Sequence, residues 1–157
     1  MSVFIGDFVV KIDSKGRFLF PSAMLSQLPD GNAQHFVVKK DIYEKCLTVF
    51  TMQEWEKQCE KIRKRLNPFN REHNIFLREF YKDTAETTLD SNNRMLIPKR
   101  LALQVLLNND ILLLGLDNKI EIWCNEIYIK SKINAEDYKM LAEKILGNIF
   151  VENIVDN

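Results

Sequence analysis

Apolar residues fall into short runs separated by turns, and this pattern predicts an α+β fold. The runs predict strands at residues 3–6, 8–12, 18–20, 36–38, 46–50, 95–97, 111–114 and 119–123. Polar and apolar residues alternate in 119–123, so we expect that strand to be half buried. The segments 18–20 and 95–97 are apolar throughout, and we expect them to be fully buried.

A different spacing predicts helices in the middle and at the end of the chain. Apolar side chains recur on one helical face at Trp55, Cys59, Ile62 and Leu66. Pro68 breaks this pattern, and a second helix is predicted over 70–81. A last helix is predicted near 136–146, with Asn134 as its N-cap.

The chain repeats one segment. Residues 12–21 read IDSKGRFLFP and residues 89–98 read LDSNNRMLIP, with the same order of residue types. Such a self-match indicates a duplicated structural unit. The fifth residue is Gly16 in one copy and Asn93 in the other, and both types readily adopt a left-handed backbone.

Each repeated segment ends in a proline, at Pro21 and Pro98. Proline suits the first residue of a helix, so short helices are predicted over 22–28 and 99–107. We therefore predict two AbrB-like, swapped-hairpin β units with short helices, a two-helix connector and a C-terminal helix. The predicted division of the chain is 1–56, 57–82, 83–131 and 132–157. A unit of about 50 residues is marginal alone, so the halves are expected to pack together or to oligomerise.

The composition of the chain is typical of a soluble globular protein. Hydrophobic residues make up 46% and charged residues 28% of the chain, as in soluble globular proteins. No apolar run reaches the roughly 18 residues of a membrane span, so we expect no membrane partner and a cytoplasmic location. Three cysteines without a CxxC spacing predict reduced thiols: Cys46, Cys59 and Cys124.

Charge is unevenly distributed although the net charge is zero. Residues 57–82 hold 8 basic and 3 acidic side chains, so the excess lies in the predicted connector. Four of its cations lie largely on the polar side of the predicted helix, as in an ordinary solvated face: Lys57, Lys61, Lys64 and Arg65. Any DNA-binding face elsewhere must therefore depend on a few well-placed cations.

No catalytic constellation is visible in the sequence. His35 and His73 lie in unrelated contexts, without metal-ligand spacing or a nucleophile signature. The few glycines are not spaced as in a phosphate-binding loop. We therefore predict that the chain is not an enzyme and has no cofactor or metal site.

The repeated Asp-x-x-x-Arg turn is the strongest candidate for function. One interpretation is structural: Asp13 pairs with Arg17, Asp90 pairs with Arg94, and the aspartates hold the turn amides. In the other, the arginines present forked donors to phosphates or guanine edges. The candidate DNA-binding residues are Ser14, Lys15, Gly16, Arg17, Asn92, Asn93, Arg94, Lys99 and Arg100.

At these turns the sequence resembles the MraZ family, whose members carry two Asp-x-x-x-Arg motifs in a tandem AbrB-like arrangement. DSKGR at 13–17 and DSNNR at 90–94 match those motifs. Further matching pieces are FIGDFVVKID at 4–13, CLTVFTMQEWEK at 46–57 and GLDNKIEIWCNEIY at 115–128. The resemblance implies a nucleoid-associated transcriptional regulator of the division and cell-wall gene cluster. It also implies a homo-oligomeric ring that binds direct repeats in operator DNA through the Arg17 and Arg94 turns.

Two departures from the family pattern concern charge. The first post-turn helix, 21–28, has no basic residue, and Asn92 stands where the first copy has Lys15. These departures predict weaker DNA binding or a different operator. Two other interpretations remain open: a ring-forming protein-interaction scaffold with structural arginine turns, and an AbrB-type antitoxin. The antitoxin is disfavoured because such proteins usually have one copy of the motif and a disordered tail.

Overall fold

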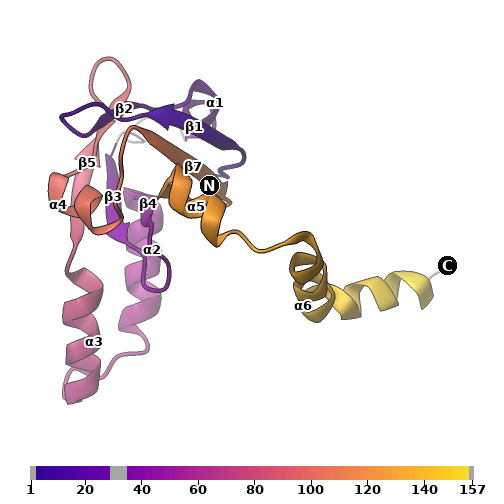
Figure 1. The fold of residues 1–157 in the computed structure, drawn as a ribbon. Helices are drawn as coiled ribbons and strands as arrows, with labels where there is room; N and C mark the ends of the chain where they lie inside the picture. Colours follow the sequence, from indigo (N-terminus) through magenta and orange to yellow (C-terminus); the bar gives the residue numbers. More distant parts are fainter. Residues whose placement is uncertain (1–2, 29–34, 156–157) are drawn as a thin grey trace. The chain divides into compact units, whose positions relative to one another are not determined.

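The computed structural model describes residues 3–28 and 35–155. The chain forms two compact units, Met1–Glu126 and Ile127–Asn157. The strands are β1 (Asp7–Lys11), β2 (Arg17–Leu19), β3 (His35–Lys40), β4 (Leu47–Thr51), β5 (Thr84–Thr88), β6 (Arg94–Leu96), β7 (Asp110–Leu116) and β8 (Lys119–Cys124) (Figure 1). The helices are α1 (Ser22–Leu25), α2 (Met52–Arg63), α3 (Arg71–Tyr81), α4 (Lys99–Gln104), α5 (Asn125–Ser131) and α6 (Ala135–Val155).

The main sheet interleaves strands from both sequence repeats. Its order is β1-β7-β8-β4-β3-β5, with every pair antiparallel. Strand β1 of the first repeat pairs with β7 of the second, and β5 of the second pairs with β3 of the first. This exchange confirms the predicted α+β fold of swapped hairpins. The strands of 1–56 and 83–131 share one sheet. The four-part division of the sequence stays a prediction.

A two-stranded ribbon, β2–β6, joins the two repeated segments directly. Its antiparallel register pairs Arg17 with Leu96, Phe18 with Met95, and Leu19 with Arg94. In Figure 1 the two turns that precede these strands, one indigo and one salmon, lie at the same end of the first unit. That end lies away from the loop between α2 and α3.

Reciprocal backbone hydrogen bonds tie each turn to the other repeat. The N–H of Ile97 donates to the carbonyl of Gly16 at 2.8 Å, and the N–H of Phe20 donates to that of Asn93 at 2.9 Å. The φ angles are +85° at Gly16 and +59° at Asn93, which confirms the left-handed backbone predicted for both.

The core uses equivalent positions of the two repeats. Fully or almost fully buried pairs are Phe18 and Met95, Phe20 and Ile97, and Met24 and Leu101. The prediction that 18–20 and 95–97 are buried throughout was wrong at Leu19 and Leu96. Their side chains are 61% and 48% exposed, because alternate residues of a strand point to opposite faces.

Helix ends follow the capping chemistry only in part. Asn134 accepts the N–H of Asp137, as predicted for a cap. Asn70 was predicted as the first residue of a helix, and the structure has it as the cap of α3, where it accepts the N–H groups of Glu72 and His73. Pro21 and Pro98 precede the first helical residue and have extended ψ angles of 135° and 137°. The predicted helix starts at residues 22 and 99 therefore agree with the structure, with each proline in the cap position, whereas both helices end before the predicted residues 28 and 107.

Several boundaries differ from the sequence prediction. Leu66 lies beyond the end of α2, and the predicted strand 3–6 is reduced to one bridge between Phe4 and Asp117. Strand β5 and helix α5 were not predicted, and α6 is longer than 136–146. Among the described residues, no helix is both long and apolar enough to cross a membrane.

We expect Gly16→Ala to destabilise the first unit. A Cβ at position 16 would lie 2.6 Å from the carbonyl oxygen of Ile97, and the φ of +85° disfavours any side chain. The expected loss is about 1–3 kcal/mol in the free energy of unfolding, measured by urea denaturation. Asn93→Gly is the matched control and should change stability by less than about 1 kcal/mol. Equal stability of Gly16→Ala and the natural chain would contradict this account of the turn.

Candidate nucleic-acid interface

The first turn is organised by one carboxylate. Oδ1 of Asp13 accepts the backbone N–H groups of Lys15 and Arg17, both at 2.9 Å. Its Oδ2 accepts Nε–H of the Arg17 side chain at 3.0 Å. The backbone carbonyl of Asp13 also accepts the N–H of Gly16, which closes the turn. Asp13 therefore fixes both the loop and the arginine that follows it.

The second turn repeats the same contacts. Oδ1 of Asp90 accepts the N–H groups of Asn92 and Arg94 at 2.9 Å, and Oδ2 accepts Nε–H of Arg94 at 2.8 Å. These contacts agree with the structural interpretation of both aspartates. This interpretation does not exclude a second role for the arginines, because only Nε of each guanidinium is used in this way.

The hydrogen bonds shift the acidity of both carboxyl groups. The pKa of Asp13 lies below its usual 3.8, chiefly because the backbone N–H of Arg17 donates to the ionised form. The pKa of Asp90 is lowered chiefly by the backbone N–H of Arg94. Both aspartates therefore remain ionised and hold their arginines near neutral pH.

Each arginine keeps an unused edge. The side chains of Arg17 and Arg94 are 31% and 35% exposed. Neither Nη1 nor Nη2 of either residue makes a hydrogen bond to another described residue. Two parallel donors in one plane suit a phosphate or the O6 and N7 atoms of guanine.

Strand alternation places these arginines on one side of the ribbon. Phe18 and Met95 point inward to the core. Arg17 and Arg94 therefore share the opposite, outer face with the exposed leucines. We call this the ribbon face and define it as Arg17, Leu19, Arg94 and Leu96. Sequence reasoning identified the two arginines but missed Leu19 and Leu96, although the two-residue period of a strand was an available signal.

The other predicted DNA-binding residues lie on the turns or beside the first turn, with the exception of Arg100. Ser14, Lys15, Asn92 and Asn93 are exposed on the turns. Lys99 lines a hollow of about 290 Å³ together with Asp13, Ser14 and Gly16, so the strand exchange brings it beside the first turn. Arg100 instead contacts Asp83 at 3.6 Å and donates to the carbonyl of Thr84 at 3.3 Å.

The connector cations behave as the solvated-face interpretation predicted. Lys57, Lys61 and Lys64 are exposed along and just after α2, and Lys64 lies 3.4 Å from Glu60 on the same face. Arg65 is exposed as well. These cations belong to α2 and the two residues after it, and none of them is part of the ribbon face.

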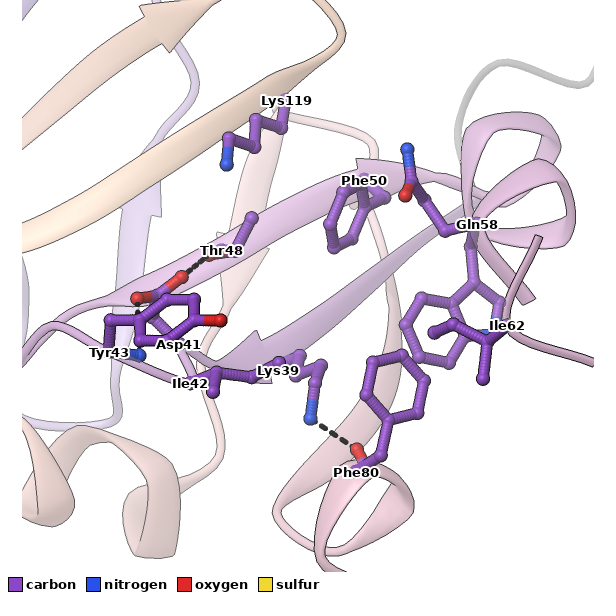
Figure 2. A pocket seen from close by; sticks show the side chains of 11 residues that line it. Lys39, Asp41, Ile42, Tyr43, Thr48, Phe50, Gln58, Ile62, Phe80 and Lys119 are labelled. Atoms are coloured by element: carbon purple, nitrogen blue, oxygen red, sulfur yellow. Dashed lines mark hydrogen bonds between the residues drawn. The ribbon is translucent and has the colours of Figure 1, made fainter. Parts of the chain in front are cut away.

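A pocket of about 250 Å³ lies between the β3–β4 hairpin and the two connector helices (Figure 2). Trp55 stacks on Phe80 with ring centroids 5.6 Å apart and the rings nearly parallel. Nζ of the buried Lys39 lies over the Phe80 ring and donates to the Phe80 carbonyl at the end of α3. Burial lowers the pKa of Lys39. These contacts anchor the helices to the sheet.

Beside this hairpin, Asp41, Cys46 and Glu121 come close enough to resemble a metal site. Asp41 already accepts the N–H groups of Tyr43 and Glu44, and Glu121 accepts the indole N–H of Trp123. Burial, together with these two carboxylates, raises the pKa of the Cys46 thiol. The thiol is thus protonated near neutral pH, which makes it a poor nucleophile.

The interleaved sheet and the paired turns define a tandem swapped-hairpin protein of the AbrB-like class. The family model described as "MraZ protein, putative antitoxin-like" matches residues 3–79 and 80–144. Similar proteins named transcriptional regulator MraZ occur in Bacteroides thetaiotaomicron (34% identity over 92% of this chain and 93% of the relative) and Phocaeicola vulgatus (36%, 92% and 94%). Another, in Cytophaga hutchinsonii, is 36% identical over 94% of this chain and 97% of the relative.

The chain therefore belongs to the MraZ family, as the two motifs predicted. The relatives are named as transcriptional regulators and not as enzymes, which agrees with the prediction that this chain is not an enzyme.

Acidification should loosen both turns. A carboxyl group whose folded-state pKa lies below 3.8 stabilises the fold above that pH. Its contribution disappears as the pH falls through the lowered value. We expect the free energy of unfolding to fall more steeply between about pH 5 and pH 2 in the natural chain than in Asp13→Asn/Asp90→Asn. Urea denaturation across this range measures the difference, and parallel curves would contradict it.

Proposed function

We propose that the chain is a DNA-binding transcriptional regulator whose ribbon face enters the major groove of double-stranded DNA. The observation that carries this proposal is the pair of guanidinium groups, each with its Nη edge unused. The names of the relatives support the same function. By the same resemblance, we propose that the protein is cytoplasmic and associated with the nucleoid.

The dimensions of a two-stranded ribbon suit this role. The major groove of B-DNA is about 12 Å wide and admits either a helix or a two-stranded β-ribbon. The exchanged register puts Arg17 and Arg94 at diagonally opposite corners of the ribbon face. One ribbon can thus present two forked cations to DNA.

The aspartates orient the two guanidinium groups before DNA binds. A free arginine side chain loses considerable rotamer entropy when it binds. Here the bond from Nε to the Asp carboxylate orients each guanidinium beforehand. Preorganisation of this kind increases affinity without adding a contact. The structural and functional interpretations of the turns are therefore compatible.

We also propose that the protein acts as a homo-oligomeric ring on direct repeats upstream of its own operon, in the division and cell-wall gene cluster. The zero net charge supports this proposal, because the 22 basic side chains of one chain are balanced by 22 acidic ones and give a single chain no overall attraction to DNA. Exposed aromatic side chains offer surface for self-association: Phe69 is 96% exposed and Tyr43 is 89% exposed.

A protein-interaction scaffold is the alternative, and the Asp–Arg ion pairs favour it. In that case the arginines serve only to close the turns. The next experiment separates the two functions.

Arg17→Ala should weaken DNA binding much more than folding. Loss of one bidentate contact to guanine is worth about 1–3 kcal/mol of binding free energy. An exposed ion pair contributes only about 0–1 kcal/mol to stability. Affinity for the DNA upstream of the gene, oligomer mass and thermal stability should be measured on one preparation. Arg17→Lys keeps the charge but removes the fork, and it should also lose affinity.

Arg71→Ala provides the matched control, because it removes an exposed arginine from the connector. It should change affinity only slightly, through long-range electrostatics. Unchanged affinity of Arg17→Ala, or a loss that accompanies disassembly, would support the scaffold instead.

Several operator repeats should be bound far more tightly than one. Linked sites raise avidity by about 10²–10⁴ when several subunits bind together. Binding should also weaken steeply with salt, since each neutralised phosphate releases counterions. Titration of duplexes with one and with three repeats, at several salt concentrations, measures both effects. Equal affinities, or a light-scattering mass of one 18.5 kDa chain, would refute the ring proposal.

A further inference from the structure

The ribbon face carries two exposed leucines beside its arginines. Leu19 lies directly across from Arg94, and Leu96 lies directly across from Arg17. Directly paired residues in an antiparallel ribbon have Cβ atoms about 4.5–5.5 Å apart. Each arginine therefore has one leucine as its immediate cross-strand neighbour on the solvent side.

The fold does not require these leucines to be apolar. The inner positions Phe18 and Met95 already supply the ribbon's contribution to the core, while about half or more of each leucine remains exposed. A single exposed leucine is ordinary on a protein surface. Here, however, two occupy equivalent places in the two repeats, each paired with an arginine that has donors to spare.

We infer that Leu19 and Leu96 contact the C5-methyl groups of thymines next to the bases that Arg94 and Arg17 contact. This inference rests on the proposed DNA binding and adds a second element of sequence recognition to it. In the major groove, thymine is distinguished by its methyl group, which favours apolar side chains. Successive bases of one strand are about 3.4 Å apart along the helix, so two side chains whose Cβ atoms are about 4.5–5.5 Å apart can reach neighbouring bases.

Charge supports DNA over a second copy of the chain as the occupant of this face. Lys15 lies on the first turn and Lys99 lies beside it, which adds two cations to the ribbon's two Asp–Arg pairs. A second copy docked face to face would bring the same positive charge. The phosphates that flank the major groove bring the opposite charge.

The test replaces every thymine of the duplex upstream of the gene with uracil. This change removes the methyl groups while keeping the base-pairing edges and the backbone charge. The natural chain should lose about fourfold in affinity for each methyl group that it contacts. Leu19→Ala/Leu96→Ala should bind the two duplexes equally. Its thermal stability should match that of the natural chain, since both side chains are exposed.

Leu116→Ala is the matched control, because Leu116 is an exposed strand leucine outside the ribbon. It should keep the full preference for the thymine duplex. If the natural chain binds both duplexes equally while Arg17→Ala still loses affinity, the leucine inference fails and the proposed function survives. If the natural chain binds neither duplex, both fail. A drop in oligomer mass of the double leucine variant, with the preference for thymine retained, would assign the leucines to a contact between copies.

Discussion

The exchange between the two hairpins is the constraint on which the rest of the structure depends. Each turn must adopt a left-handed backbone so that its carbonyl can accept an N–H from the other repeat, at Ile97 and at Phe20. These bonds align β2 with β6 and turn Phe18 and Met95 into the core. The same alignment leaves Arg17 and Arg94 outside. Folding of the core and exposure of the candidate site are thus two results of one register.

This coupling explains why the structural and functional interpretations of the Asp-x-x-x-Arg turn need not compete. Asp13 uses one oxygen for two backbone amides and the other for Nε of Arg17. The carboxylate therefore shapes the loop and orients the guanidinium at once. The donors on Nη1 and Nη2 point to no other described residue, so a ligand can use them without breaking the turn. Under the proposed function, DNA affinity and turn stability can consequently be separated by choosing which atom a mutation removes.

The sequence predicted what depends on local pattern. Apolar runs located most strands, the duplicated segment located both turns, and Asn134 marked the start of the last helix through capping. It did not predict β5, whose sequence TAETT lacks an apolar run and which forms by pairing with β3. It also could not show that Lys99 lies beside the first turn, because strand exchange is a relation between distant segments. The outward direction of Leu19 was available from strand period but was masked by its apolar neighbours.

The two ends of the ribbon differ in the number of basic residues that they carry. The first turn has Lys15 within it and Lys99 beside it, and Lys99 comes from the second repeat. In the second turn the corresponding residue is the neutral Asn92, and the first repeat has Ser22 where the second has Lys99. The turn that holds Arg94 therefore has no lysine, whereas the turn that holds Arg17 has Lys15 within it and Lys99 beside it. If the proposed DNA binding holds, this asymmetric charge gives the pseudo-symmetric ribbon a preferred direction on DNA, which a set of direct repeats requires and a palindrome does not.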